Sequence, residues 1–221
     1  MKSLLTGLIL FPLFGWGQLT IDVNLMVSKQ PVRLNQPVQL NDHFFQLEQA
    51  RFYLSKFEFY QNDQLIAVDS VAAYLIDFEN DSTRKLIFPQ INAFQVNKIC
   101  FLFGIDSITN TSGAMSGALD PMHGMYWSWQ SGYINCKLEG TFSIPKQEAF
   151  QFHLGGYVRP FSGVQQLVLK SNQTTNPQLN IDLSSLMNEV IRSKSDLHVM
   201  SPSIKAVEYT QLLTKSIELK P

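Results

Sequence analysis

Apolar and polar residues alternate over many short stretches of this chain. The first stretch carries apolar side chains at Ile21, Val23, Leu25 and Val27. Because neighbouring side chains of a β-strand point to opposite faces, a period of two predicts strands with one buried face. Further alternating or continuous apolar stretches lie at 52–54, 72–78, 99–103, 133–138, 150–154, 164–169 and 179–183. The pattern therefore predicts a chain built mainly from short strands.

Turn-forming residues separate these stretches, for example Asn62-Asp63, Ser162-Gly163 and Asn176-Pro177. Many short strands joined by polar turns are typical of antiparallel β-sandwiches. Helical signals are scarce. A short helical turn fits 184–190, and a better helix follows Ser201, which can act as N-cap with Pro202 at the first helical position. We therefore expect an all-β fold, an antiparallel β-sandwich with one short C-terminal helix.

The first 17 residues have the pattern of a secretory signal peptide. Lys2 precedes an apolar run from Leu4 to Phe14, and the small residues Gly15 and Gly17 follow. The run is too short to span a bilayer, and no cysteine follows it, which argues against a lipid anchor. We expect cleavage after Gly17 and an exported, soluble protein, periplasmic or secreted. No linker or break in composition divides residues 18–221, so we expect a single domain.

Charge and cysteine content exclude only a few classes of partner. The formal net charge is -1 and there is no basic cluster, so neither nucleic acid nor an anionic membrane surface is an expected partner. The only two cysteines are Cys100 and Cys136, which lie on two predicted strands. In an oxidising compartment they could form a disulfide, whereas the alternative is two buried free thiols.

The stretch from Leu119 to Gly140 is unusually rich in aromatic and sulfur-containing side chains. Its beginning overlaps a long irregular segment at 104–124, which leads into the tryptophan motif. Irregular segments of this length are usually functional or disordered. In an extended strand, Trp127 and Trp129 would share one face with Ser131 and form an aromatic patch. Filling of the sandwich core would explain two such tryptophans equally well.

The chain contains four histidines: His43, His123, His153 and His198. A copper or zinc site needs two or three neutral imidazoles, with or without a thioether or thiolate. No HxH or HExxH spacing is present. His153 is followed by Gly155-Gly156, which allow a backbone or a ligand to approach closely, and His123 lies between Met122 and Met125. These two histidines are the better candidates.

Motifs for catalysis are absent from the sequence. There is no GxSxG elbow, phosphate-binding loop, dinucleotide fingerprint or CxxC pair. Asp106, Asp120 and Glu139 are carboxylates of the kind that cap turns and strand ends. We therefore expect no enzymatic activity.

Several stretches together resemble the MbnP-like family of copper-binding proteins. They are GALDPMHGMYWSWQSGYINCKLEG, FQFHLGGY and HVMSPSIKA, with RFYLSKFEFY and KICFLFGID upstream. The resemblance covers most of residues 18–221. It implies a β-rich fold, a periplasmic or secreted location and copper bound near the tryptophan motif. In studied members it also implies oxidation of a tryptophan to kynurenine by a partner di-haem protein related to MauG and bacterial cytochrome c peroxidases.

Oxidation to kynurenine would give a tryptophan position the donor atoms that copper binding requires. An intact indole has no free lone pair for a metal, whereas kynurenine exposes an aniline-type amine and a ketone. On this resemblance, we expect His153 and His123 to bind copper, with Trp127 or Trp129 modified. The reserve ligands are Met122, Met125, His43 and His198.

The expected function is thus copper acquisition or storage, with the di-haem protein and an outer-membrane receptor for metal uptake as partners. Two alternatives remain open. One is a surface module that binds carbohydrate or a protein through the aromatic patch of Trp127, Trp129 and Tyr126. The other is a small redox enzyme with an open metal position.

Overall fold

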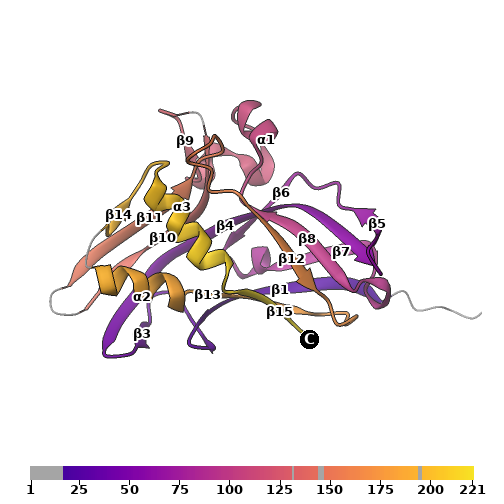
Figure 1. Cartoon of the computed structure of the whole chain (residues 1–221), viewed down its shortest axis with the longest axis horizontal. Coiled ribbons are helices and arrows are strands. Elements are labelled where there is room, and N and C mark those ends of the chain that lie inside the picture. Colours follow the sequence, from indigo (N-terminus) through magenta and orange to yellow (C-terminus); the bar gives the residue numbers. More distant parts are fainter. Residues whose placement is uncertain (1–16, 131, 144–146, 194–195) are drawn as a thin grey trace, which may run out of the picture.

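The computed structural model describes residues 17–130, 132–143, 147–193 and 196–221. Residues 1–16, which make up nearly all of the predicted signal peptide, lie outside the described residues, as does Ser131. Within the described part, two β-sheets face each other around a common hydrophobic core (Figure 1). The predicted all-β sandwich is confirmed.

The smaller sheet has the order β15–β13–β1–β2, with β7 beside β1. Its strands are β1 (Gln18–Val27), β2 (Gln30–Pro31), β7 (Lys85–Asn92), β13 (Gln178–Asp182) and β15 (Ile217–Lys220). Burial in β1 alternates along its whole length, and Ile21, Val23, Leu25 and Val27 all point into the core. The period of two in the sequence therefore gave the correct buried face.

The larger sheet has the order β12–β8–β4–β10–β11–β14, with β3, β5 and β6 beside β4 and β9 beside β10. Its strands are β3 (Pro37–Leu40), β4 (His43–Gln61), β5 (Gln64–Val68), β6 (Ala73–Asp77), β8 (Lys98–Phe103), β9 (Tyr126–Trp127), β10 (Gly132–Phe142), β11 (Glu148–Gly155), β12 (Gln165–Lys170) and β14 (His198–Val199). The 19-residue strand β4 pairs with both β10 and β8, so it joins the two halves of this sheet.

A β-bulge in β4 changes which residues face the core. The register shifts between Ser55 and Glu58, where Lys56 has a φ of 55°. Phe52 is buried before the bulge and Phe57 after it, so the parity of the buried positions reverses. Phe57 then contacts Phe88 of the opposite sheet, with ring centroids 5.2 Å apart. The bulge lets one strand contribute to the core along its full length.

The details differ from the prediction in strand direction and in helix content. The pairs β1–β13 and β11–β14 are parallel. Both join strands that are distant in sequence, and the alternation of apolar residues does not specify the direction in which such strands pair. Two longer helices are present, α2 (Ser184–Ser193) and α3 (Ile204–Thr214), and β15 follows α3. The N-cap of α3 is Ser203 and not Ser201, since the Ser203 hydroxyl accepts a hydrogen bond from the Ala206 amide.

The two helices close one side of the core. Helix α2 buries Leu186, Met187 and Val190. Helix α3 packs on β11, where the rings of Tyr209 and Phe152 lie 5.2 Å apart. Two short 3-10 turns, η1 (Asp81–Arg84) and η2 (Ala93–Gln95), flank strand β7.

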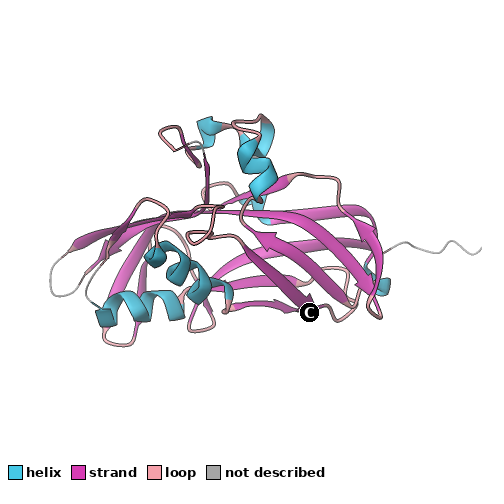
Figure 2. Cartoon of the chain, turned by 45° about the horizontal axis from the view of Figure 1, so that its top comes forward, coloured by secondary structure: helices cyan, strands magenta, loops and turns pink. Residues whose placement is uncertain are grey.

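The segment 104–130 covers part of the outer face of the larger sheet, on the side away from the core (Figure 2). It contains α1 (Ser107–Thr111), η3 (Gly117–Leu119), η4 (Pro121–His123) and β9. Together with the sheet beneath, it forms a second hydrophobic cluster: Tyr53, Ala73, Ile105, Leu119, Met125, Trp127, Tyr133 and Ile134. The aromatic stretch therefore packs outside the main core.

Both cysteines are buried and free. Cys136 lies opposite Phe52 and belongs to the main core. Cys100 lies opposite Glu58 and the exposed Val168, on the other face of the sheet. Since the two side chains point to opposite faces, they cannot meet in a disulfide.

No helix among the described residues is both long enough and apolar enough to cross a membrane.

Candidate metal site

The two tryptophans do not share a strand face, because β9 ends at Trp127. Trp127 pairs with Gly132 of β10, and the chain then turns, with the Gln130 amide donating to the Trp127 carbonyl at 3.3 Å. The expected extended strand through Trp129 is therefore wrong. The rings nevertheless touch, with centroids 5.9 Å apart. Trp127 is 6% exposed and Trp129 is 66% exposed, so the two indoles occupy very different surroundings.

Trp127 lies directly on Gly155 at the end of β11. A Cβ atom on Gly155 would lie only 2.6 Å from Cζ3 of the Trp127 ring. Gly156 has a φ of +97° and passes close to the Phe161 carbonyl. The close approach that Gly155-Gly156 indicated is confirmed, and the group that approaches is the Trp127 indole.

Replacing Gly155 with alanine should therefore displace the Trp127 ring. The added methyl group has no room beside the indole or the Tyr133 carbonyl, and such overpacking typically costs about 1–3 kcal/mol. We expect a loss of this size in the free energy of unfolding, measured in urea, together with a change in tryptophan fluorescence. Gly113→Ala supplies the control, because its Cβ would meet nothing within 4 Å. That variant should show only the smaller cost of its positive φ.

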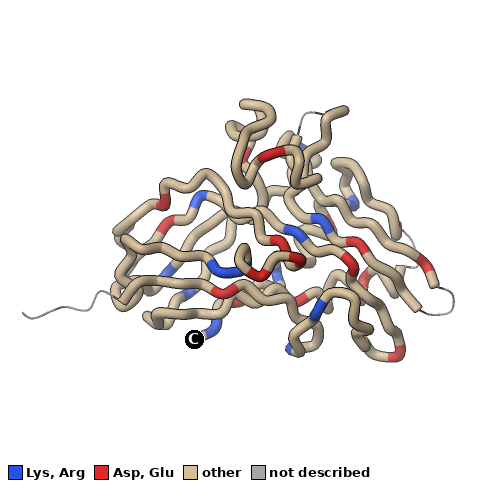
Figure 3. The backbone as a smooth tube through the Cα atoms, turned by 180° about the vertical axis from the view of Figure 1, so that it is seen from behind, with Lys and Arg blue, Asp and Glu red and all other residues tan. Residues whose placement is uncertain are grey.

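His153 lies on the same face of the sheet as Gly155 and belongs to a row of polar residues. Arg51 on β4, Lys137 on β10 and His153 on β11 stand side by side in the register. They point away from the core, since their strand neighbours Leu138 and Phe152 are buried in it. In Figure 3, acidic residues (red) and basic residues (blue) lie close together below the segment 104–130.

Arg51 ties this segment to the sheet. Its guanidinium pairs with Asp77 at 2.9 Å and Glu79 at 2.6 Å, and it donates to the backbone carbonyl of His123 at 2.9 Å. Lys137 pairs with Glu139 at 3.4 Å. The outer face therefore carries two neighbouring charge clusters, one of Arg51 with Asp77 and Glu79 and the other of Lys137 with Glu139 and His153.

His153 is 8% exposed, and its Nε2 lies 2.6 Å from Oε1 of Glu139. Burial lowers the pKa of His153, and the hydrogen bond to Glu139 offsets this only in part. Burial opposes ionisation of Glu139, but the hydrogen bond from His153 and the charge of Lys137 outweigh it, so the pKa of Glu139 is lowered. At neutral pH the pair is thus a neutral imidazole and a carboxylate.

These shifts predict a pH dependence of stability. Both pKa values are lower in the folded chain than in the unfolded chain, so the unfolded chain binds more protons in acid. The stabilisation is present above about pH 6.5, the unfolded histidine value, and is lost as the pH falls through the folded pKa. Urea unfolding should show a free energy that declines below about pH 6.5. His153→Gln should flatten this decline, and an equally steep decline in that variant would contradict the assignment.

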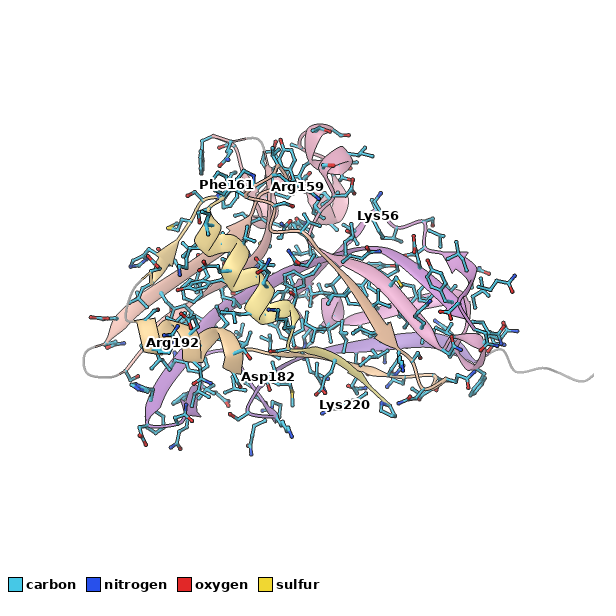
Figure 4. The ribbon with its side chains drawn as sticks, viewed as in Figure 1. Lys56, Arg159, Phe161, Asp182, Arg192 and Lys220 are labelled. Carbon is cyan, nitrogen blue, oxygen red and sulfur yellow. The ribbon has the colours of Figure 1, made fainter. Side chains whose placement is uncertain are left out.

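His123 occupies a separate position. It is exposed, its Nε2 lies 3.0 Å from the Gly117 carbonyl, and it lines a groove with Leu75 and Ala118. Trp127 instead lines a pocket of about 180 Å³. Arg159 and Phe161, which are labelled in Figure 4, also line this pocket, and it shares no residue with the groove at His123. The structure thus places the Trp127 ring on β11, the strand that carries His153. His123 instead lies beside Arg51 on β4, two strands away from His153.

The reserve ligands are scattered. Met122 is 92% exposed, and Met125 is fully buried in the outer cluster. His43 begins β4, and His198 lies exposed on β14 opposite Gln151.

Comparison with known proteins places the chain in a family. The MbnP family model matches residues 16–204, which is most of the chain. The chain belongs to the MbnP family. A solved structure, MbnP from Methylosinus trichosporium, superposes with a TM-score of 0.58 at 16% sequence identity, covering 77% of each chain. At this identity the likeness shows the fold alone. No curated protein matches the sequence.

This MbnP family member has few conventional metal donors close together. Among the described residues, no three His, Cys, Asp or Glu side chains gather in a way that could hold a metal ion. The residues therefore fit a metal only where other donors contribute. Two further donors are candidates on the side of His153. One is residue 127 in an oxidised form, and the other is a methionine thioether.

That thioether belongs to Met200. The parallel register pairs Gln151 with His198 and Phe152 with Val199, where β14 ends. Met200 is the next residue in the direction that leads along β11 to His153. Val199 is buried and Met200 is 43% exposed, which turns Met200 to the outer face. The stretch HVMSPSIKA contained this residue, but only the pairing of β14 with β11 could indicate its approach to β11.

Proposed function

We propose that this protein binds copper after export and serves copper acquisition or storage, without catalysis of its own. One observation carries the proposal: the buried His153 is two residues from Gly155, on which the Trp127 indole lies. Alternate residues of a strand are roughly 7 Å apart. From that spacing two side chains on the same face can reach a single metal ion.

The protonation state of His153 supports a role as a metal ligand. A metal ion competes with protons for imidazole, so a ligand must be neutral to bind well. Burial lowers the pKa of His153 and keeps it neutral. Cu(I) favours imidazole and soft sulfur donors. Met200, the residue after β14, would supply the sulfur, so our preferred ligands are His153, Met200 and modified residue 127.

Trp127 is the better candidate for oxidation into a ligand. Trp129 is exposed, whereas Trp127 is buried and lies against the strand that carries His153. Conversion to kynurenine breaks the C2=C3 bond of the indole and adds an oxygen atom to each carbon, and hydrolysis then releases the former C2 as formate. The two oxygen atoms require an external oxidant, peroxide or dioxygen, and we propose that a di-haem peroxidase-like partner catalyses the step. Trp129, which contacts Trp127 from the solvent side, would be the first indole that such a partner meets.

His123 takes part only if the segment 104–130 moves toward His153. In its present position its ring is bonded to Gly117 and its backbone is held by Arg51. An exported location follows from the signal-peptide pattern at 1–17. Delivery of the metal would then require an outer-membrane receptor.

Metal analysis tests the proposal. Protein purified from its native host should contain copper, or should retain about one Cu(I) per chain after anaerobic addition and desalting. A His153→Ala sample treated in parallel reports non-specific retention. Protein that holds no more copper than this variant would contradict the proposal.

The alternative of an aromatic binding module rests on the exposure of Trp129 and Phe161 beside the Trp127 pocket. Such a module would bind a carbohydrate or protein without any metal. Quenching of tryptophan fluorescence by oligosaccharides that disappears in Trp129→Ala, in a protein that retains no copper, would favour this alternative.

A further inference from the structure

The pocket beside Trp127 is walled by rings from three separate segments of the chain. The Trp127 indole comes from β9, Tyr157 and Phe161 come from the loop after β11, and Pro202 precedes α3. Trp127 is buried and Phe161 is exposed, so the apolar wall extends from the interior to the surface. Aromatic walls of this kind accept the face or the edge of another ring.

Backbone hydrogen bonds hold the loop that forms one wall of the pocket. The Phe161 amide donates to the Val158 carbonyl at 2.9 Å, and the Gly163 amide donates to the Gly156 carbonyl at 3.0 Å. Gly156 has a φ of +97°, a conformation that glycine adopts without strain. The wall is therefore fixed before any ligand arrives, which lowers the ordering cost of binding.

Arg159 is the one charged residue among the described residues that line this pocket. It is exposed and lies close to Phe161 (Figure 4). Its guanidinium makes no ion pair, hydrogen bond or ring contact with any described residue. A guanidinium presents its N–H donors in a planar fork that matches the two oxygen atoms of a carboxylate. The pocket therefore offers an anion an unused partner next to an aromatic wall.

We propose that this pocket binds a small aromatic carboxylate, with its ring against Trp127 and Phe161 and its acid group on the Arg159 guanidinium. The volume limits the size of the ligand, because sites for drug-sized molecules usually measure about 300–1,000 Å³. A pocket of about 180 Å³ has room for a single ring and its acid group, but not for a chain of sugars. The inference needs no copper and goes beyond the proposed function.

Titration of ¹⁵N-labelled, copper-free protein with benzoate, followed by ¹H–¹⁵N NMR, tests this inference. We expect the Trp127 indole N–H and the Gly156 amide to shift, with a dissociation constant of about 1 mM or lower. Benzamide, the uncharged analogue, should bind at least about tenfold more weakly, because it lacks the charge that pairs with Arg159. Acetate, an acid without a ring, should leave both resonances in place. No shift with benzoate, or equal affinities for benzoate and either analogue, would overturn the inference.

Matched arginine variants test the role of the charge. Arg159→Gln changes an exposed side chain and should weaken benzoate binding about tenfold, whereas Arg159→Lys keeps the charge and should recover part of the affinity. Arg33→Gln is the control, because Arg33 is also exposed and makes no ion pair within the described part of the chain, yet it lies outside the pocket. Wild-type affinity in Arg159→Gln, or an equal loss in Arg33→Gln, would overturn the proposal.

Discussion

Replacing His153 with alanine is expected to lower the affinity for Cu(I) by about 100-fold. Structural zinc sites of four ligands contribute about 10–16 kcal/mol. By analogy we assign one Cu(I) ligand about 3 kcal/mol, which corresponds to about two powers of ten in the dissociation constant. Competition with a chromophoric Cu(I) chelator measures the change. Because His153 lies on the outer face, away from the main core, the variant should remain folded.

His43→Ala is the matched control for this experiment. His43 is also a histidine on a strand of the larger sheet, but it begins β4 opposite Leu40, away from the Trp127 pocket. Its removal should leave the affinity unchanged. Equal losses in the two variants, or no loss in His153→Ala, would exclude His153 as the principal ligand.

Replacing Trp127 with phenylalanine should abolish both the covalent modification and much of the copper affinity. Phenylalanine still covers Gly155 but cannot become kynurenine. In peptide mass spectrometry of protein from the native host, the peptide around residue 127 should lose the gain of about 4 Da that marks kynurenine. Chelator competition should show a loss of about tenfold or more, because one ligand is missing.

Trp129→Phe is the comparison variant. It should retain the modification at residue 127 and bind copper with nearly unchanged affinity. A slower appearance of the modification would agree with first contact of the oxidant at Trp129. If instead Trp129 carries the added mass and Trp127 remains intact, the assignment of the ligand to Trp127 is wrong.

The fold was predictable where side-chain burial alone determines a strand. In β1 buried and more exposed side chains alternate, and the four predicted positions are all buried, while Leu19 extends the same buried face by one further residue. The bulge at Lys56 and the parallel pairing of β1 with β13 were not predictable, because both depend on partners far away in sequence. Helix α3 was expected, but its N-cap is two residues later because the Ser203 hydroxyl makes the capping bond.

The site was predictable in part. The sequence indicated His153 and the glycines beside it, and the structure adds that the Trp127 ring fills the space those glycines leave. Composition could not show that the chain turns after Trp127, so Trp129 was placed on the wrong face. Glu139 was missed as a neighbour of His153, since only the pairing of β11 with β10 brings it there. The approach of the chain at Met200 toward β11 was also missed, because it follows from the pairing of β14 with β11. His123 was favoured for its methionine neighbours, yet its ring lines another groove.

Diffraction data collected at the copper edge from Cu(I)-loaded crystals test the central claim most directly. We predict a single anomalous peak on the outer face of the larger sheet, in contact with the His153 imidazole and residue 127. A peak at His43 or His198, or a loaded crystal without any ordered copper, would contradict it.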